Sequence, residues 1–410
     1  MLDFLEIVGS SATFKLSGGA ISNFAKTPTL RVQCIDQQNH AVFEYTFTGS
    51  ESTTYGSALP YGYYEVRVVA YNSYGQVVSK TKPLLLYKTP MAGFVYIKKG
   101  TFTMGSPDSE VGHQANEAQQ SFTISKDYLI QRTPCTPKYL SAVKTAYATL
   151  YNSGVTLTRV KITNAEWSTT AINQGTMYGS WSASDETPAV SISWERIMDV
   201  DTANSTISGS AAPYTATATP FSSSGVGICT ALNALNRSGQ DYYLSGYQYC
   251  LPTECQWEFA CRAGCSDALY NDTALDATTT PAYSTANSPQ PNLCEIAWYN
   301  YNSGGSKRKV GLLKPNAWGL YDMLGNVWEW VLDQYNASYA AVATAGETVH
   351  GSPVYTEVSS GSWGVNGVYH GDGANPKDVT YWGRCSARSN AILRNKGHEY
   401  IGFRLALSPA

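Results

Sequence analysis

The sequence is poor in charged residues and in histidine. Only 14% of its 410 residues are Asp, Glu, Lys or Arg, the formal net charge is -3, and five residues are histidines. We therefore expect no nucleic-acid partner, because binding to nucleic acid needs a basic surface. No stretch approaches ~18 uninterrupted apolar residues, so insertion into a membrane is not expected either.

The chain also shows no secretory signal and no regular cysteine framework. Residues 1–8 read MLDFLEIV, without a basic leader before a long apolar run. The nine cysteines are an odd number and lack the spacing of a small disulfide-bonded module. Buried free thiols are the favoured interpretation of Cys255, Cys261 and Cys265. A zinc site is the alternative for Cys261 and Cys265, which are four residues apart, but no CxxC pair or matched histidine supports it.

Aromatic residues and glycine are abundant instead, and the N-terminal part has the pattern of a β domain. The chain contains 30 Tyr, 10 Trp and 35 Gly. Period-two alternation predicts strands at residues 29–34, 42–47, 63–70 and 77–80. Residues 59–75 resemble the last hairpin of an immunoglobulin-like or fibronectin-type module. Because prolines interrupt central strands, Pro83 and Pro90 mark a boundary. We predict an immunoglobulin-like β-sandwich over residues 1–88.

The remainder of the chain combines helical segments with long polar loops. Residues 139–150 have helical spacing of apolar side chains, and a second helix is predicted over residues 254–262. Pro252 and Thr253 provide a start signal for that second helix. Segments rich in Ser, Thr, Ala, Asn and Gly are interpreted as loops, where function tends to lie: residues 164–188, 201–224, 266–292 and 336–360.

Four motifs follow one another in a fixed order along this second part. The most informative is GLYDMLGNVWEW at residues 319–330, and the others are GTFTMGS at 100–106, LPTECQWEF at 251–259 and IGFRL at 401–405. Together they resemble the formylglycine-generating enzyme (sulfatase-modifying factor) family, whose members have elaborated C-type lectin folds. The resemblance implies an α+β protein with a C-type lectin-like domain at residues 92–410.

The same resemblance argues against the chemistry for which the family is named. Formylglycine-generating enzymes use two cysteines that bind copper and activate oxygen, placed between two framework words. Those words are visible here as GSW at residues 361–363 and RCSARS at 384–389, but residues 364–383 contain no cysteine. Since a Cu(I) site needs thiolate ligands, we expect no such enzyme activity and no required cofactor. The alternative is a formylglycine-generating enzyme-like oxidoreductase whose active residues lie elsewhere.

Other catalytic arrangements have little support. No two histidines have the spacing of iron ligands, and no G-x-S-x-G elbow is present. His370 and Asp372 are close enough in sequence to suggest a general base, but a glycine-flanked surface loop is the favoured interpretation.

Calcium is the one metal that the motifs suggest. In related folds the Gly-Asn-x-Trp-Glu word surrounds a hard cation with oxygen ligands, and the matching positions are Asn326, Val327 through its carbonyl, and Glu329. The alternative is that Asn326 and Glu329 bind neighbouring loop backbone without a metal. A lectin that binds sugar through calcium is a further alternative, although the Glu-Pro-Asn and Gln-Pro-Asp loops of such lectins are absent.

The C-terminal residues 363–404 keep the family's framework positions while the residues between them are chemically mixed. This cassette resembles that of a diversity-generating retroelement variable protein, in which a lectin fold presents a mutagenised ligand-binding surface. Aromatic and arginine side chains supply most of the contact energy in such surfaces. The predicted ligand-binding residues are Tyr369, Tyr381, Trp382, Arg384, Asn390, Ile392, Arg394, His398 and Tyr400.

This resemblance implies a non-catalytic recognition protein with a protein or glycan ligand on a target cell surface. A phage receptor-binding component or a bacterial surface adhesin would fit it, and the missing secretory signal favours the virion. The alternative is an ordinary family member whose final hairpin has diverged.

Overall fold

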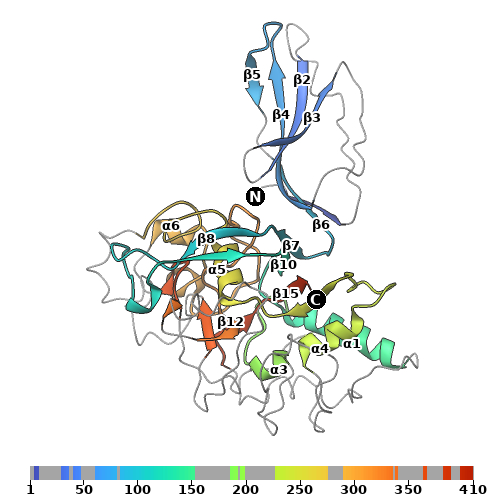
Figure 1. The fold of residues 1–410 in the computed structure, drawn as a ribbon, viewed down its shortest axis with the longest axis vertical. Coiled ribbons are helices and arrows are strands. Elements are labelled where there is room, and N and C mark those ends of the chain that lie inside the picture. The colour runs from blue at the N-terminus through green and yellow to red at the C-terminus, as the bar shows by residue number, and fades with distance from the viewer. Residues whose placement is uncertain are drawn as a thin grey trace. The chain divides into compact units, whose positions relative to one another are not determined.

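The computed structural model describes two compact units, residues 1–98 and 99–410, each considered by itself (Figure 1). The described residues are 4–8, 29–36, 40–47, 61–80, 84–152, 185–192, 194–198, 227–275, 290–335, 338–339, 363–366, 382–388 and 398–409. The division falls after residue 98, whereas the sequence patterns placed it between residues 88 and 92.

The first unit contains one mixed sheet with the strand order β1-β6-β4-β2-β3, and β5 pairs with β4. Its strands are β1 (Phe4–Val8), β2 (Thr29–Ile35), β3 (Ala41–Phe47), β4 (Gly62–Tyr71), β5 (Val77–Lys80) and β6 (Leu84–Thr89), and β7 (Phe94–Ile97) follows. The four strands predicted from alternation are all present. The immunoglobulin-like sandwich is not confirmed, because within the described residues β1 to β6 form a single sheet.

The second unit has mixed α and β content, as the motifs indicated. Its strands are β8 (Gly100–Met104), β9 (Gln120–Ile124), β10 (Tyr128–Gln131), β11 (Tyr247–Cys250), β12 (Trp328–Gln334), β13 (Trp363–Asn366), β14 (Ile401–Phe403) and β15 (Ala406–Pro409). Its helices are η2 (Ala115–Glu117), α1 (Pro137–Asn152), α3 (Trp194–Met198), α4 (Ile228–Leu235), α5 (Glu254–Arg262), α6 (Pro291–Cys294) and α7 (Asn300–Ser303).

Strand β12 is the centre of the part of the fold that concerns function. It pairs with β13 in antiparallel and with β14 in parallel orientation, so the two ends of the C-terminal cassette lie on either side of it. Trp330, Val331 and Leu332 are all buried, which shows that both faces of the strand are covered. The indole of Trp330 donates to the Ile192 carbonyl, and that of Trp194 donates to the Val331 carbonyl. These two bonds fix the start of α3 to β12.

Both helices predicted from the sequence are confirmed. Along α1 the buried side chains Leu140, Val143, Tyr147 and Leu150 recur at helical spacing, and α1 lies beside α4 (Figure 1). Helix α5 covers the predicted residues and begins with a capping box at Thr253, whose hydroxyl accepts from the Gln256 amide.

The GN motif before β12 depends on a glycine for steric reasons. Gly325 has a φ of +77°, and a Cβ there would collide with the backbone of Trp298. The next residue, Asn326, also has a positive φ of 62°, a conformation that asparagine tolerates better than most residues.

Most of the predicted loops fall outside the described residues. The described end of the 164–188 segment and residues 266–275 lack regular secondary structure, whereas α6 lies at the end of the 266–292 segment. Among the described helices, none has both the length and the apolar composition needed to cross a bilayer.

Candidate ligand-binding surface

Four of the nine predicted ligand-binding residues are described: Trp382, Arg384, His398 and Tyr400. The other five lie outside the described residues, so their positions stay predictions: Tyr369, Tyr381, Asn390, Ile392 and Arg394. Trp382, His398 and Tyr400 are partly exposed, whereas Arg384 is buried.

The partly exposed aromatic residues are tied to the beginning of β12. The Trp382 ring packs edge-on against Trp328, with ring centroids 5.3 Å apart. The Trp328 amide donates to the Tyr400 carbonyl, and the rings of His398 and Tyr400 lie 5.1 Å apart. Trp328 itself is almost fully buried and belongs to the core. Trp382 and Tyr400 therefore lie next to the first residue of β12, and His398 lies beside Tyr400.

Backbone hydrogen bonds hold the His398 end of this surface. The His398 carbonyl accepts from the amides of Ser191 and Ile401. At Gly402, one residue further into β14, a Cβ would lie 2.8 Å from the Ala189 carbonyl oxygen. The cassette therefore crosses the 185–192 segment too closely for a larger residue at position 402.

The prediction that Arg384 points outward is wrong. Its guanidinium has no solvent exposure and donates to both oxygens of Glu117, at 2.7 and 2.8 Å, and to Glu110 at 2.7 Å. A buried guanidinium needs such partners, because an unpaired charge in the interior is strongly unfavourable. Arg384 is thus part of the framework of the cassette.

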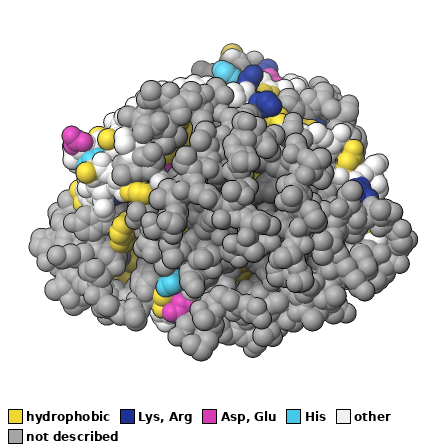
Figure 2. All heavy atoms as spheres, turned by 60° about the horizontal axis from the view of Figure 1, so that its bottom comes forward, with side chains coloured by type: hydrophobic (Ala, Val, Ile, Leu, Met, Phe, Trp, Pro, Cys, Tyr) yellow, Lys and Arg dark blue, Asp and Glu magenta, His cyan; other side chains and the backbone are white. Residues whose placement is uncertain are grey.

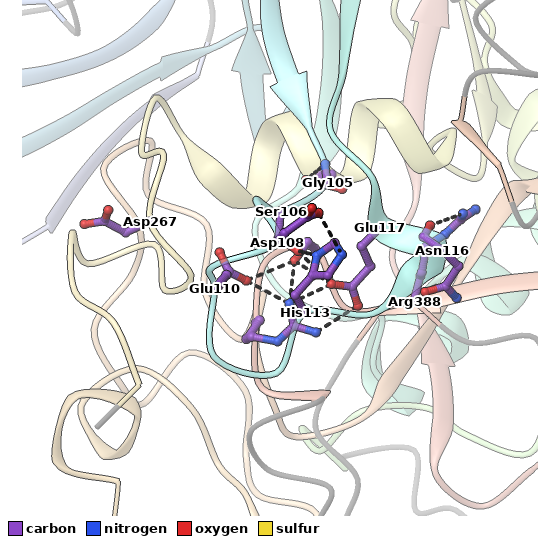
Figure 3. Close-up of polar contacts among 12 residues, drawn as sticks. Gly105, Ser106, Asp108, Glu110, His113, Asn116, Glu117, Asp267 and Arg388 are labelled. Carbon is purple, nitrogen blue, oxygen red and sulfur yellow. Dashed lines mark hydrogen bonds and ion pairs between the residues drawn. The ribbon is translucent and has the colours of Figure 1, made fainter. Parts of the chain in front are cut away.

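The loop after β8 supplies the acidic partners of Arg384. Figure 3 shows Ser106, Glu110, His113 and Glu117 gathered in one polar group, whereas Asp267 lies apart from it. The Ser106 hydroxyl lies 2.8 Å from His113 Nδ1 and donates to Glu117 at 2.9 Å. His113 Nε2 is 3.4 Å from Asp108. This network could not be found from the sequence, because no local pattern connects Glu117 with a residue 267 positions away.

The Ser106–His113–Asp108 arrangement has the residue types of a hydrolytic triad but does not provide a nucleophile. Ser106 is only 1% exposed, and its hydroxyl contacts the Glu117 carboxylate as well as the histidine. A nucleophilic serine must give its proton to the imidazole and reach the substrate. The group is therefore a structural network around Arg384.

Arg388 is a second buried anchor that the sequence reasoning missed. Its guanidinium forms two 2.7 Å bonds with the carboxylate of Glu254 at the start of α5. The rings of Tyr335 and Tyr339 lie against it, at 4.6 and 4.3 Å from the guanidinium carbon to the ring centroids. The framework word RCSARS was the available signal, but it does not reveal the partner.

The residues proposed for calcium do not fit that ion. Glu329 accepts two bonds from Arg404, at 2.7 and 2.8 Å, and a third from the Trp257 indole at 2.6 Å. Asn326 uses its amide oxygen to accept from the Arg308 backbone and its amide nitrogen to donate to the Arg308 carbonyl. Both side chains are buried and engaged with N–H or C=O groups, whereas calcium needs six to eight free oxygen ligands. The alternative interpretation, a hydrogen-bonded loop, therefore fits the geometry of Asn326 and Glu329 better, whereas the role of the Val327 carbonyl stays a prediction.

Two other buried carboxyl groups have perturbed acidity. Burial raises the pKa of Asp322 to about 6, although hydrogen bonding from the Gly311 amide and the charge of Arg404 lower it in part. Burial also raises the pKa of Glu258, while Arg262 and the Gly105 amide oppose the shift. Among the described residues, Glu258 Oε2 has no hydrogen-bond partner, so part of the hydration lost on burial is not replaced.

The interpretation of Cys255, Cys261 and Cys265 as buried thiols holds in part, since all three are free but only Cys261 is buried and the other two are half-buried. All nine cysteines are free, and Cys261 and Cys385 are fully buried. Burial and the neighbouring Cys385 thiol raise the pKa of Cys261 well above its usual value, so a thiolate is disfavoured. Within the described residues, Cys265 groups with Asp267 and Asp272 rather than with Cys261. Both aspartates are exposed, and exposed acidic groups often lie together without a metal.

The described surface has no extended patch of one charge in the view of Figure 2, where charged side chains appear singly or in small groups. This agrees with the low charge content of the chain.

The family assignment rests on a match that covers most of the chain. The sequence profile of the sulfatase-modifying factor enzyme 1-like domain matches residues 83–409. The chain belongs to this family. A relative in Bos taurus, the inactive C-alpha-formylglycine-generating enzyme 2, is 35% identical over 97 residues, which are 22% of this chain and 28% of the relative. The Bos taurus formylglycine-generating enzyme is 27% identical over 166 residues, 38% of each chain.

Solved structures of similar proteins cover more of the family domain at lower identity. PvdO from Pseudomonas aeruginosa is 22% identical with a TM-score of 0.48, over 77% of this chain and 94% of its own. Treponema denticola variable protein 1 is 20% identical with a TM-score of 0.40, over 76% of this chain and 93% of its own. The relatives found by sequence include proteins named as formylglycine-generating enzymes and one named as inactive.

Proposed function

We propose that this family member is a non-catalytic recognition protein. In this proposal the second unit is a C-type lectin-like scaffold that displays a ligand-binding surface, of the kind found in diversity-generating retroelement variable proteins. The ligand is a protein or glycan on a target cell, and the chain serves in a phage receptor-binding component or a bacterial adhesin. Neither a metal nor another cofactor takes part.

The observation that carries the proposal is that the described cassette residues fall into a partly exposed group and a buried group. Trp382, His398 and Tyr400 are partly exposed, whereas Arg384 and Arg388 are buried and ion-paired. A surface of this design can change its exposed residues without loss of the fold, because exposed substitutions usually alter stability by less than about 0.5 kcal/mol. Exposed aromatic residues are also the side chains that contribute most to protein recognition.

The absence of the catalytic cysteine pair supports the non-enzymatic part of the proposal. Residues 364–383 contain no cysteine, and Cys385 is a buried thiol in the framework word. We expect no oxidation of a sulfatase-type cysteine peptide, with or without copper, as measured by mass spectrometry of the peptide. A turnover that disappears in the Cys385→Ala variant would favour the oxidoreductase alternative.

A display library tests the recognition surface without knowledge of the natural ligand. The library randomises Trp382, His398 and Tyr400 in the full chain on yeast, and hen egg-white lysozyme is the probe. A control library of equal size randomises the buried Trp257, Trp330 and Phe403. We expect the first library to display folded protein and to yield lysozyme binders, and the control library to lose display. Equal loss of display in the two libraries would contradict the proposal.

A further inference from the structure

The segment 383–388 is buried along its whole length, although it lies inside the cassette. All six residues are inaccessible, whereas the preceding Trp382 and the later residues 398–400 are partly exposed. A buried stretch between exposed positions must be held by contacts from elsewhere in the fold, because it contains two arginines that cannot be left unpaired.

The contacts that hold this segment come from three separate places. Glu117, in η2, binds Arg384 with both carboxylate oxygens and also contacts Ser386 at 3.4 Å. Glu254, in the first turn of α5, binds Arg388 with both oxygens. The backbone is held as well, since the Cys385 amide donates to the Ala268 carbonyl at 2.8 Å.

The second ion pair is reinforced by stacking and by a bond to the backbone. Arg388 donates to the Asn116 carbonyl at 3.0 Å and lies against the rings of Tyr335 and Tyr339. The amide of the Asn116 side chain donates to the Tyr335 hydroxyl at 2.7 Å. η2, α5 and the residues after β12 therefore converge on the end of the segment.

Bidentate pairs of this kind specify direction as well as distance. Two parallel N–H to oxygen bonds fix the plane of the guanidinium, and burial prevents water from replacing either partner. The side-chain positions of Glu117 and Glu254 thus determine where residues 383–388 lie. The position of Trp382 is constrained as well, because it is only two residues from Arg384.

We propose that Glu117 and Glu254, which lie outside the cassette, are positioning residues for the recognition surface. They hold Arg384 and Arg388, and through them they fix the direction in which the chain enters the buried segment from Trp382. The role as part of a recognition surface rests on the proposed function, whereas the anchoring itself does not. Arg384 and Arg388 are accordingly framework positions at which diversification would be harmful.

Two readouts test the anchoring and its effect on recognition. The variants are Glu117→Gln and Glu254→Gln, which keep the size of the side chain and remove its charge. The control is Glu186→Gln, which removes a carboxylate that pairs at the surface with Lys138 and Lys309. The first readout is hydrogen–deuterium exchange of the Cys385 and Ala387 amides, compared with the amides of β12. The second is the affinity of a lysozyme binder from the display library, with each variant in its framework.

We expect exchange at Cys385 and Ala387 to rise about tenfold or more in both Gln variants, with β12 unchanged, since local opening can occur without global unfolding. Affinity for lysozyme should fall about tenfold while the circular dichroism spectrum is retained, because misplaced contact residues raise the dissociation rate. The control should change neither value. If a Gln variant does not fold, the Arg388→Lys variant is measured instead. Lysine keeps the positive charge but cannot form the two parallel hydrogen bonds with the carboxylate.

The outcomes separate this inference from the proposed function. A display library that yields no lysozyme binder contradicts the proposed function. The exchange experiment still tests whether Glu117 and Glu254 anchor residues 383–388. Unchanged exchange at Cys385 and Ala387, or unchanged affinity in both Gln variants, would overturn the positioning role. Restored affinity in a Glu254→Asp variant, which regains the charge, would show that the effect depends on the ion pair.

Discussion

Arg404 and Glu329 form a fully buried, two-pronged ion pair between residues 75 positions apart in the sequence. Arg404 also donates to the carbonyls of Gln131 and Tyr321, and Glu329 accepts from the Trp257 indole. The pair therefore joins β12 to the end of β14 and to α5. It occupies the carboxylate of Glu329, one of the candidate calcium ligands that the motif suggested.

Removing one partner of this pair should destabilise the protein strongly. We expect Glu329→Gln and Arg404→Met each to lower the free energy of unfolding by about 3–5 kcal/mol, because the remaining group is left buried without its partner. Urea denaturation at neutral pH measures the change. Lys314→Met is the control, since it breaks the exposed pair with Glu295, where about 0–1 kcal/mol is expected. A loss below about 1 kcal/mol for both buried variants would contradict the account.

Chelation should leave stability unchanged, because the side-chain oxygens of Asn326 and Glu329 are already engaged. A ligand bound only to the native state would raise the melting temperature by mass action. We therefore expect the same melting temperature in excess EDTA and in millimolar calcium chloride. The wild type and the Asn326→Ala variant are compared in the same buffers. A calcium-dependent rise in melting temperature that the wild type shows and the variant lacks would restore the calcium interpretation.

Asp322 should make stability depend on pH in the mildly acidic range. Its folded-state pKa of about 6 lies above the ordinary value of 3.8, so the native state binds more protons between these two pH values. The group's contribution is therefore fully present below about pH 4 and is lost as the pH rises through about 6. The expected size is on the order of 2–3 kcal/mol.

The Asp322→Asn variant isolates this effect because asparagine keeps an oxygen that can accept from the Gly311 amide at 2.7 Å in the parent. From pH 4 to pH 7 we expect the wild type to lose stability relative to the Asp322→Asn variant, as measured by the free energy of unfolding of each. Asp267→Asn, at an exposed position, is the control. Parallel pH profiles for Asp322→Asn and the wild type would show that Asp322 has an ordinary pKa.

The aromatic residues should separate into a stabilising set and a surface set. Trp330→Ala and Phe403→Ala should each lose about 3–5 kcal/mol, because both side chains are fully buried. His398→Ala and Tyr400→Ala, at partly exposed positions, should cost much less. Thermal melts of the four variants measure the difference. A similar loss in both sets would favour the alternative of a divergent final hairpin over a recognition surface.

The sequence by itself determined the local structure of both units. Alternation located four of the six strands in the first unit's sheet, apolar spacing located α1, and Pro252 with Thr253 indicated the start of α5. These features depend on neighbours within a few residues, which a single sequence displays directly. The motifs also identified the family, because its framework words are themselves short and contiguous.

Only the tertiary structure decided which cassette residues face outward. Trp382 and Arg384 are two residues apart and both belong to the types found in binding surfaces, yet one is partly exposed and the other is buried. The difference comes from Glu117, which lies 267 positions away and makes burial of the guanidinium favourable. In the same way, the Glu329 carboxylate pairs with Arg404, a partner that the local motif does not indicate. An arginine or a carboxylate has the same local pattern whether it pairs inside the protein or meets a ligand, so its role depends on the partner that folding brings to it.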